Sequence, residues 1–249
     1  MLTPPGTWFS RDARAVTRLF GPALKRAQYL INWSREHRYI YIEVPKTGCS
    51  TIKLTLQRIE RNDPAYAPPN MHSRPASPLL RPLSAPKEFL LARTSPDYFR
   101  FCFVRNPYTR ILSAYLDKIA STDFKRGERM KALGISPSES PTLLQFLEVL
   151  KRTDPAAFDI HWARQCDLLD LGGMTFEFTG RFESFEQDFA RVLERIHQGQ
   201  EWLTAVRAHR TDAAALIQDR IGPDERRLIA DIYANDFDRF GYSRDLAAA

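Results

Sequence analysis

The sequence has few cysteines and no arrangement of them that indicates a metal site or a disulfide framework. Cys49, Cys102 and Cys166 are far apart and form no CxxC pair. Structural zinc sites need closely spaced ligands, and disulfide frameworks use an even number of cysteines. We therefore expect reduced thiols and no bound metal, and reduced thiols favour a cytoplasmic protein.

Long apolar runs are also lacking. No segment near Met1 is long and apolar enough for a signal-peptide core or a membrane span. This pattern predicts a protein without a transmembrane segment in a cytoplasmic, bacterial setting. A chain from which an anchor had been removed would look the same.

The glycine-rich loop of ATPases, GxxxxGK followed by Ser or Thr, is absent, and so is an acidic motif for magnesium. What is present suits a soluble globular protein: 249 residues, of which 43% are hydrophobic and 27% charged. The net charge of +6 favours anionic partners such as nucleotides, acidic glycans, nucleic acid or a membrane surface. Charge alone does not choose among them.

Strand and helix patterns alternate along the chain. Apolar, β-branched and aromatic runs predict strands at 39–44, 100–105 and 174–179. Helical periodicity predicts helices at 11–33 (one or two), 50–61, 106–119, 141–151, 158–169, 184–197 and 223–237. The proline-rich segment 62–87 is expected to be a loop, and 121–140 an irregular insertion.

This alternation predicts the α/β class, with a three-layer parallel sheet flanked by helices. We expect a single domain over 1–249, with a recognisable core at 39–242 and a helical N-terminal extension at 1–38.

The first candidate site follows the strand at 39–44. The residues VPKTGCST at 44–51 make a tight turn that leads into a helix, and a helix start binds anions through its N–H groups and dipole. Lys46 adds a cation, and Thr47, Ser50 and Thr51 add hydroxyls. Together with Gly48 and Cys49 they form a predicted phosphate cradle.

The second candidate site repeats this design after the strand at 100–105. Arg105 stands at the carboxyl end of the strand, where α/β folds bind ligands, and Ser113 lies in the following helix. A guanidinium fork suits a phosphate. Two such sites in one chain indicate a ligand with two separated phosphates.

Together these residues resemble the sulfotransferases that use 3′-phosphoadenosine-5′-phosphosulfate (PAPS), in the carbohydrate branch with the chondroitin, dermatan and heparan 2-O enzymes and bacterial relatives. Residues 44–51 are similar to the family's 5′-phosphosulfate loop, and 103–115 (FVRNPYTRILSAY) to its 3′-phosphate motif. Segments 161–165, 180–184 and 236–242 follow in family order.

The resemblance implies the sulfotransferase version of the nucleotide-kinase fold, PAPS as donor and no metal. It implies that Lys46 contacts the bridging oxygen and the sulfonate, and that Thr47 to Thr51 hold the 5′-phosphate. Arg105 and Ser113 would bind the 3′-phosphate.

An alcohol acceptor needs a general base, and histidine titrates in the useful range. His72, in the proline-rich loop, stands where related carbohydrate enzymes place a catalytic histidine. His161 is the alternative base, and with Trp162 it is a candidate for acceptor binding. Arg207 and Arg210, in a polar segment, are candidates for covering the nucleotide.

We therefore expect in-line transfer of a sulfonate to an acceptor hydroxyl, and the expected acceptor is a carbohydrate. Two alternatives remain open: an ATP-dependent small-molecule kinase and a non-enzymatic polyanion-binding protein. Nucleic acid is not an expected partner, and no transmembrane segment is expected. The sequence leaves the acceptor and the oligomeric state open.

Overall fold

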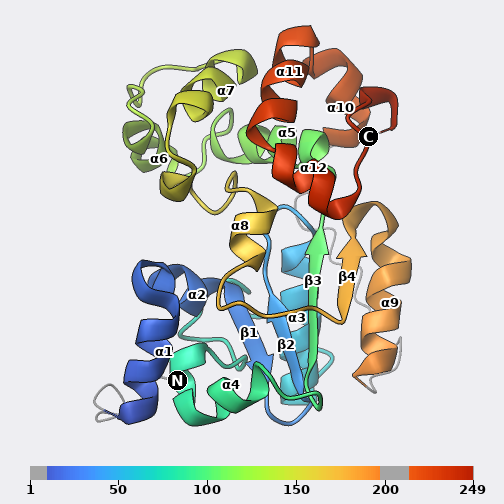
Figure 1. Cartoon of the computed structure of the whole chain (residues 1–249). Coiled ribbons are helices and arrows are strands. Elements are labelled where there is room, and N and C mark those ends of the chain that lie inside the picture. Colours follow the sequence, from blue (N-terminus) through green and yellow to red (C-terminus); the bar gives the residue numbers. More distant parts are fainter. Residues whose placement is uncertain (1–9, 197–212, 249) are drawn as a thin grey trace. The chain divides into compact units, whose positions relative to one another are not determined.

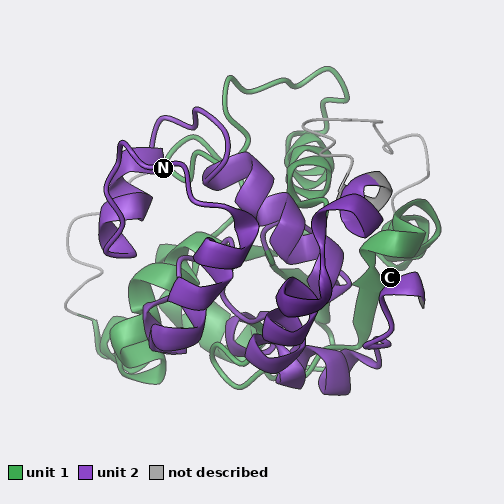
Figure 2. Ribbon diagram, turned by 90° about the horizontal axis from the view of Figure 1, so that it is seen from above, with its two compact units in different colours: residues 1–44, 48–103, 169–208 green, residues 45–47, 104–168, 209–249 purple. Residues whose placement is uncertain are grey.

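The computed structural model describes residues 10–196 and 213–248. Contacts divide the chain into two compact units, each assembled from separate segments (Figure 2). Unit 1 comprises 1–44, 48–103 and 169–208, and unit 2 comprises 45–47, 104–168 and 209–249. The single domain over 1–249 stays a prediction.

Unit 1 is built on a four-stranded sheet of order β1-β2-β3-β4 (Figure 1). β2 (Tyr39–Ile42) runs parallel to β3 (Phe99–Val104), and β4 (Phe178–Arg181) flanks β3 in the same direction. β1 (Ile31–Ser34) pairs antiparallel with β2. The predicted α/β class is therefore confirmed. The sheet, predicted to be parallel, is mostly so and has one antiparallel edge strand that the prediction lacked.

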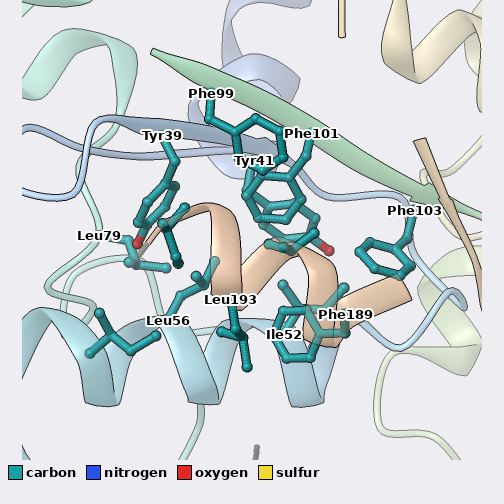
Figure 3. Packing of buried hydrophobic residues seen from close by; sticks show 13 residues of the cluster. Tyr39, Tyr41, Ile52, Leu56, Leu79, Phe99, Phe101, Phe103, Phe189 and Leu193 are labelled. Carbon is teal, nitrogen blue, oxygen red and sulfur yellow. The ribbon is translucent and has the colours of Figure 1, made fainter. Parts of the chain in front are cut away.

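One face of the sheet packs against α3 (Cys49–Arg61) and α9 (Phe185–Arg195), as Figure 3 shows. Successive strand side chains point to opposite faces, so Tyr39 and Tyr41 share this face with Phe101. The rings of Tyr41 and Phe101 stack with centroids 5.1 Å apart. These large aromatic side chains form the core against which α3 packs. The core therefore fixes the start of α3, where the predicted phosphate loop ends.

The opposite face packs against α1 (Arg11–Phe20) and α4 (Pro86–Ala92), and α2 (Leu24–Leu30) leads into the edge strand. Trp33 of β1 pairs with Ile40 of β2 on this face, and the centroids of the Trp33 and Phe89 rings lie 5.9 Å apart. Helices on both faces make the three layers that were predicted.

The helical extension predicted for 1–38 is wrong at its end, because residues 31–34 form a strand of the sheet. Ile31 and Trp33 alternate with Asn32 and Ser34, which is the period of a strand, and all four are buried against β2. The sheet therefore begins before the predicted core.

Several predicted boundaries also change. Residues 158–164 form turns, and only α8 (Gln165–Leu169) is helical there. The strand expected at 174–179 lies at 178–181, and two glycines with positive φ, Gly172 and Gly173, come directly before the expected start. The insertion at 121–140 contains α6 (Arg126–Ala132).

In its described part, unit 2 is a set of packed helices. α11 (Pro223–Ile232) packs against both α7 (Leu143–Arg152) and α5 (Pro107–Lys118), and α10 (Ala213–Arg220) packs against α5. The helix predicted at 223–237 breaks at Tyr233, and α12 (Ala234–Phe240) follows. Within 10–196 and 213–248, no helix is both long and apolar enough to cross a membrane.

Candidate functional site

In unit 1, Gly48 is the residue of the predicted phosphate loop at which α3 begins. Gly48 is the N-cap of α3, has φ +84° and receives no side-chain cap. A Cβ at this position would lie 2.5 Å from a ring carbon of Phe185, so only glycine fits both the conformation and the space. The first N–H groups of a helix lack intrahelical partners and carry the positive end of its dipole.

In unit 2, the loop residues before Gly48 are held by two arginines. Lys46 has φ +74°, an uncommon conformation for a residue with a side chain. Its carbonyl accepts a hydrogen bond from Nη1 of Arg105 at 3.2 Å, and the carbonyl of Pro45 accepts one from Nε of Arg110 at 3.0 Å. Both guanidinium groups therefore stabilise the backbone of the loop.

The side chain of Lys46 is only 11% exposed and forms an ion pair with Asp117, Nζ to Oδ2 being 2.8 Å. Burial would raise the pKa of Asp117, but the hydrogen bond and charge of Lys46, with Lys118 behind it, lower it. Lys46 is thus held as an ammonium group beside a carboxylate. Sequence reasoning did not find Asp117, although it lies in the helix of the second motif.

Arg105 and Ser113, the residues predicted to bind a 3′-phosphate, are both buried in unit 2. The backbone N–H and carbonyl of Arg105 bond to the side-chain amide of Gln165 at 2.9 and 2.8 Å. Asp236 in turn accepts hydrogen bonds from the backbone N–H groups of Gln165 and Cys166. This polar network fixes the residue that directly follows β3, and Gln165 and Asp236 belong to two of the three downstream segments in family order.

In unit 1, the predicted base His72 lies beside the predicted phosphate-binding Ser50. Nε2 of His72 is 3.0 Å from Oγ of Ser50, and Nδ1 is 3.3 Å from Oε1 of Glu43. Oε2 of Glu43 accepts a hydrogen bond from Nζ of Lys53 at 2.9 Å. Four polar side chains thus form a chain from the start of α3 into the core of unit 1.

Glu43 and Lys53 were missed by sequence reasoning. Both are buried; Glu43 is the one charged residue of the strand predicted at 39–44, and Lys53 lies between Ile52 and Leu54 in the helix after Gly48. Burial alone would raise the pKa of Glu43, but Lys53 and His72 hold it well below its usual range. The single charge in the strand at 39–44 was a signal that could have found Glu43, whereas the mixed composition of the helix hides Lys53.

The loop that carries His72 is tied down on both sides. Before it, the backbone carbonyl of Met71 accepts a hydrogen bond from Gln57 at 2.8 Å. After it, the buried guanidinium of Arg74 donates to the carbonyl of Ile31 at 2.9 Å and to the side chain of Asn32. These anchors give the imidazole a defined place although the loop has no regular structure.

The same region contains one group that could hold a metal. Glu43, Cys49 and His72 bring a carboxylate, a thiol and an imidazole within 4.8 Å of one another. These are zinc ligands, and they are too dispersed in the sequence for a motif search to find. The ammonium group of Lys53 already neutralises Glu43, which opposes a second cation.

His161 and Trp162 lie in a turn of unit 2 and not on the predicted helix. Nδ1 of His161 contacts Asp159, and burial lowers the pKa of His161 although Asp159 opposes this effect. Trp162 is 2% exposed and packs edge-on against Phe146, so it has a core role rather than an open face for an acceptor. Arg207 and Arg210 lie outside the described residues.

Comparison with known proteins identifies the family. A protein-family model described as "Sulfotransferase family" matches residues 30–243. The chain belongs to the sulfotransferase family. The match begins one residue before β1, in agreement with a sheet that starts before residue 39.

Curated relatives of this sulfotransferase are named carbohydrate sulfotransferases. It is 28% identical to human carbohydrate sulfotransferase 14 over 231 residues, covering 84% of the chain and 59% of the relative. It is 27% identical to human carbohydrate sulfotransferase 8 (85% and 55% covered) and 24% identical to mouse carbohydrate sulfotransferase 11 (84% and 65% covered). The chain thus spans between half and two thirds of these relatives. No solved structure matches it significantly.

The predicted cytoplasmic, bacterial setting is wrong. It rested on reduced thiols and on the lack of an apolar run, and neither feature identifies a compartment. The matching relatives are carbohydrate sulfotransferases of animals, and this finding overturns the predicted setting.

Proposed function

We propose that this sulfotransferase moves a sulfonate from PAPS to a hydroxyl group of a carbohydrate. The observation that carries the proposal is the loop at 44–51, inside the family match, where Lys46 precedes a helix start without a side-chain cap. The names of the relatives support a carbohydrate acceptor.

The proposed donor contacts follow the two motifs. Thr47 to Thr51 hold the 5′-phosphate through backbone N–H and hydroxyl groups at the start of α3. Arg105 and Ser113 bind the 3′-phosphate, and a guanidinium group suits its geometry. The hydrogen bonds of Arg105 and Arg110 to the backbone of Lys46 and Pro45 support the role of the first motif, because they hold the loop that would contact the donor.

In the proposed reaction, an acceptor oxygen attacks the sulfur in line with the bond to the 5′-phosphate. Negative charge grows on the departing phosphate oxygen, and Lys46 stabilises that charge. His72 removes the proton of the acceptor hydroxyl. A sulfonate carries less negative charge than a γ-phosphoryl group, so a metal ion is not part of the proposal.

Thermal unfolding with different ligands tests the donor. Adenosine 3′,5′-bisphosphate should raise the melting temperature, because a ligand of the native state stabilises it by mass action. ATP with magnesium should have little effect. If only ATP with magnesium raises the melting temperature, the protein is a kinase and the proposal fails.

A non-enzymatic polyanion binder is the other alternative. It would bind heparin with a strong dependence on salt and would show no preference for a 3′-phosphate. Equal stabilisation by adenosine 5′-phosphate and by the 3′,5′-bisphosphate would favour this alternative over a donor site.

A further inference from the structure

A buried ion pair lies directly behind the imidazole of His72. Glu43 follows β2 and Lys53 lies in α3, and their side chains are 2% and 0% exposed. Removing two charges from water is costly, and apolar residues of similar size often stabilise a core as well or better. The pair therefore calls for an explanation other than stability.

We infer that Glu43 is the positioning residue for His72: its carboxylate, paired with Lys53, keeps the ring proton on Nδ1 and leaves Nε2 as the base that faces the phosphate loop. This inference rests on the proposed function. The inference adds two things to the proposed function: Glu43 and Lys53 as the residues that would prepare the base, and Nε2 of His72 as the nitrogen that would accept the proton.

The contacts around the ring support this tautomer. Oγ of Ser50 lies 3.0 Å from Nε2, where its hydroxyl can donate to an unprotonated nitrogen. The proton then resides on Nδ1, which lies 3.3 Å from Oε1 of Glu43. Nδ1 makes no full hydrogen bond, so the main effect of this second contact is electrostatic. A proton on Nδ1 beside a carboxylate is the arrangement that orients a histidine base.

The same arrangement would stabilise the charge that forms in the reaction. The acceptor oxygen forms a bond to sulfur, the bond from sulfur to the 5′-phosphate oxygen breaks, and the hydroxyl proton moves to Nε2. His72 becomes an imidazolium ion beside the negative charge of Glu43. Because Lys53 keeps that carboxylate ionised, Glu43 does not take the proton itself.

The groups that face His72 come from three segments. Glu43 follows β2, Ser50 and Cys49 belong to α3, and the side chain of Asn70 accepts a hydrogen bond from the backbone N–H of His72 within its own loop. Lys53 acts through Glu43. Among these groups in the described part of unit 1, Glu43 supplies the carboxylate that faces the ring.

Kinetics on a double-mutant cycle test the coupling. His72→Ala should lower kcat by about 10²–10⁴-fold, the usual contribution of a general base. Glu43→Gln should lower kcat about 10–100-fold, within that loss, and should cause no further loss when His72 is already alanine. A Glu43→Gln effect that is the same with and without His72 overturns the inference.

A second variant guards against misfolding, because Glu43→Gln leaves Lys53 buried without its partner. Glu43→Leu with Lys53→Met removes both charges and keeps the core apolar. This double variant should retain its melting temperature and its stabilisation by the bisphosphate, and should still lose turnover. Wild-type turnover in it overturns the inference.

Nitrogen NMR separates this inference from the proposed function. In ¹⁵N-histidine-labelled wild type at neutral pH, His72 should show a protonated Nδ1 and an unprotonated Nε2, and the apolar double variant just described should shift the ring toward a mixture of tautomers. Glu60→Gln is the matched control, since Glu60 lies on α3 like Lys53 but accepts its hydrogen bond from the hydroxyl of Tyr39 in β2, at 3.1 Å. A protonated Nε2 in wild type overturns the inference, whereas absent sulfonate transfer with the expected tautomer overturns only the proposed function.

Discussion

Gly48 gives the sharpest test of the loop's geometry. Alanine at this position would keep φ near +84°, which costs a residue with a side chain about 1–2 kcal/mol. Its Cβ would also lie 2.5 Å from Cε2 of Phe185, and relieving such a clash in a packed core costs typically about 1–3 kcal/mol. Gly48→Ala should therefore lower the free energy of unfolding by about 2–5 kcal/mol, a large part of the roughly 5–15 kcal/mol of an ordinary domain.

Urea unfolding at 25 °C measures this loss, with Gly173→Ala as the matched control. Gly173 also lies in unit 1 and has φ +58°, but a Cβ there meets no atom within 4 Å. The control should lose only the strain, about 1–2 kcal/mol. In a Phe185→Leu background, the cost of Gly48→Ala should fall toward that of the control. Equal losses for Gly48→Ala and Gly173→Ala would refute the clash, and with it the tight packing of the loop against α9.

Three further predictions concern Asp117, the dependence of stability on pH, and metal. Asp117 neutralises Lys46, so Asp117→Asn should tighten the binding of adenosine 3′,5′-bisphosphate roughly tenfold, or by about 1.4 kcal/mol. Isothermal calorimetry measures this change, and weaker binding would contradict the prediction. The free energy of unfolding should fall below about pH 5. Folding lowers the pKa values of Glu43, Asp117 and Asp159, so the stability that these carboxylates contribute is lost as they protonate. A free energy of unfolding in urea that is unchanged from pH 7 to pH 3 would contradict this prediction. EDTA should leave turnover unchanged; activity that is lost with EDTA and restored by zinc would instead assign a metal to Glu43, Cys49 and His72.

β2, β3 and the two motifs could be predicted because their signals are local. Residues 39–44 are uniformly apolar or aromatic apart from Glu43, as a buried parallel strand requires, and Gly48 and Pro107 mark the start of the following helices. The edge strand at 31–34 was missed because four residues with one buried Trp do not stand out beside a helix. Its pairing with β2, a long-range feature, decides its conformation.

The polar network around His72 could not be predicted for the same reason. Glu43, Lys53 and His72 are separated by up to 29 positions, and only the packing of α3 on the sheet brings the first two together. Trp162 shows the opposite error. Its position beside His161 suggested an acceptor contact, but its large apolar side chain is buried in unit 2 against Phe146.

The central claim, that Lys46 assists transfer of a sulfonate to a carbohydrate, is tested most directly by following the sulfonate. Wild type would be incubated with ³⁵S-labelled PAPS and a pool of desulfated glycosaminoglycans and simple oligosaccharides. Lys46→Ala would be compared with Lys131→Ala, an exposed lysine of α6 in the same unit. We predict labelled saccharide with wild type and Lys131→Ala, and a rate at least about 10²-fold lower with Lys46→Ala. No labelled saccharide with wild type, or equal rates for the two variants, would contradict the account.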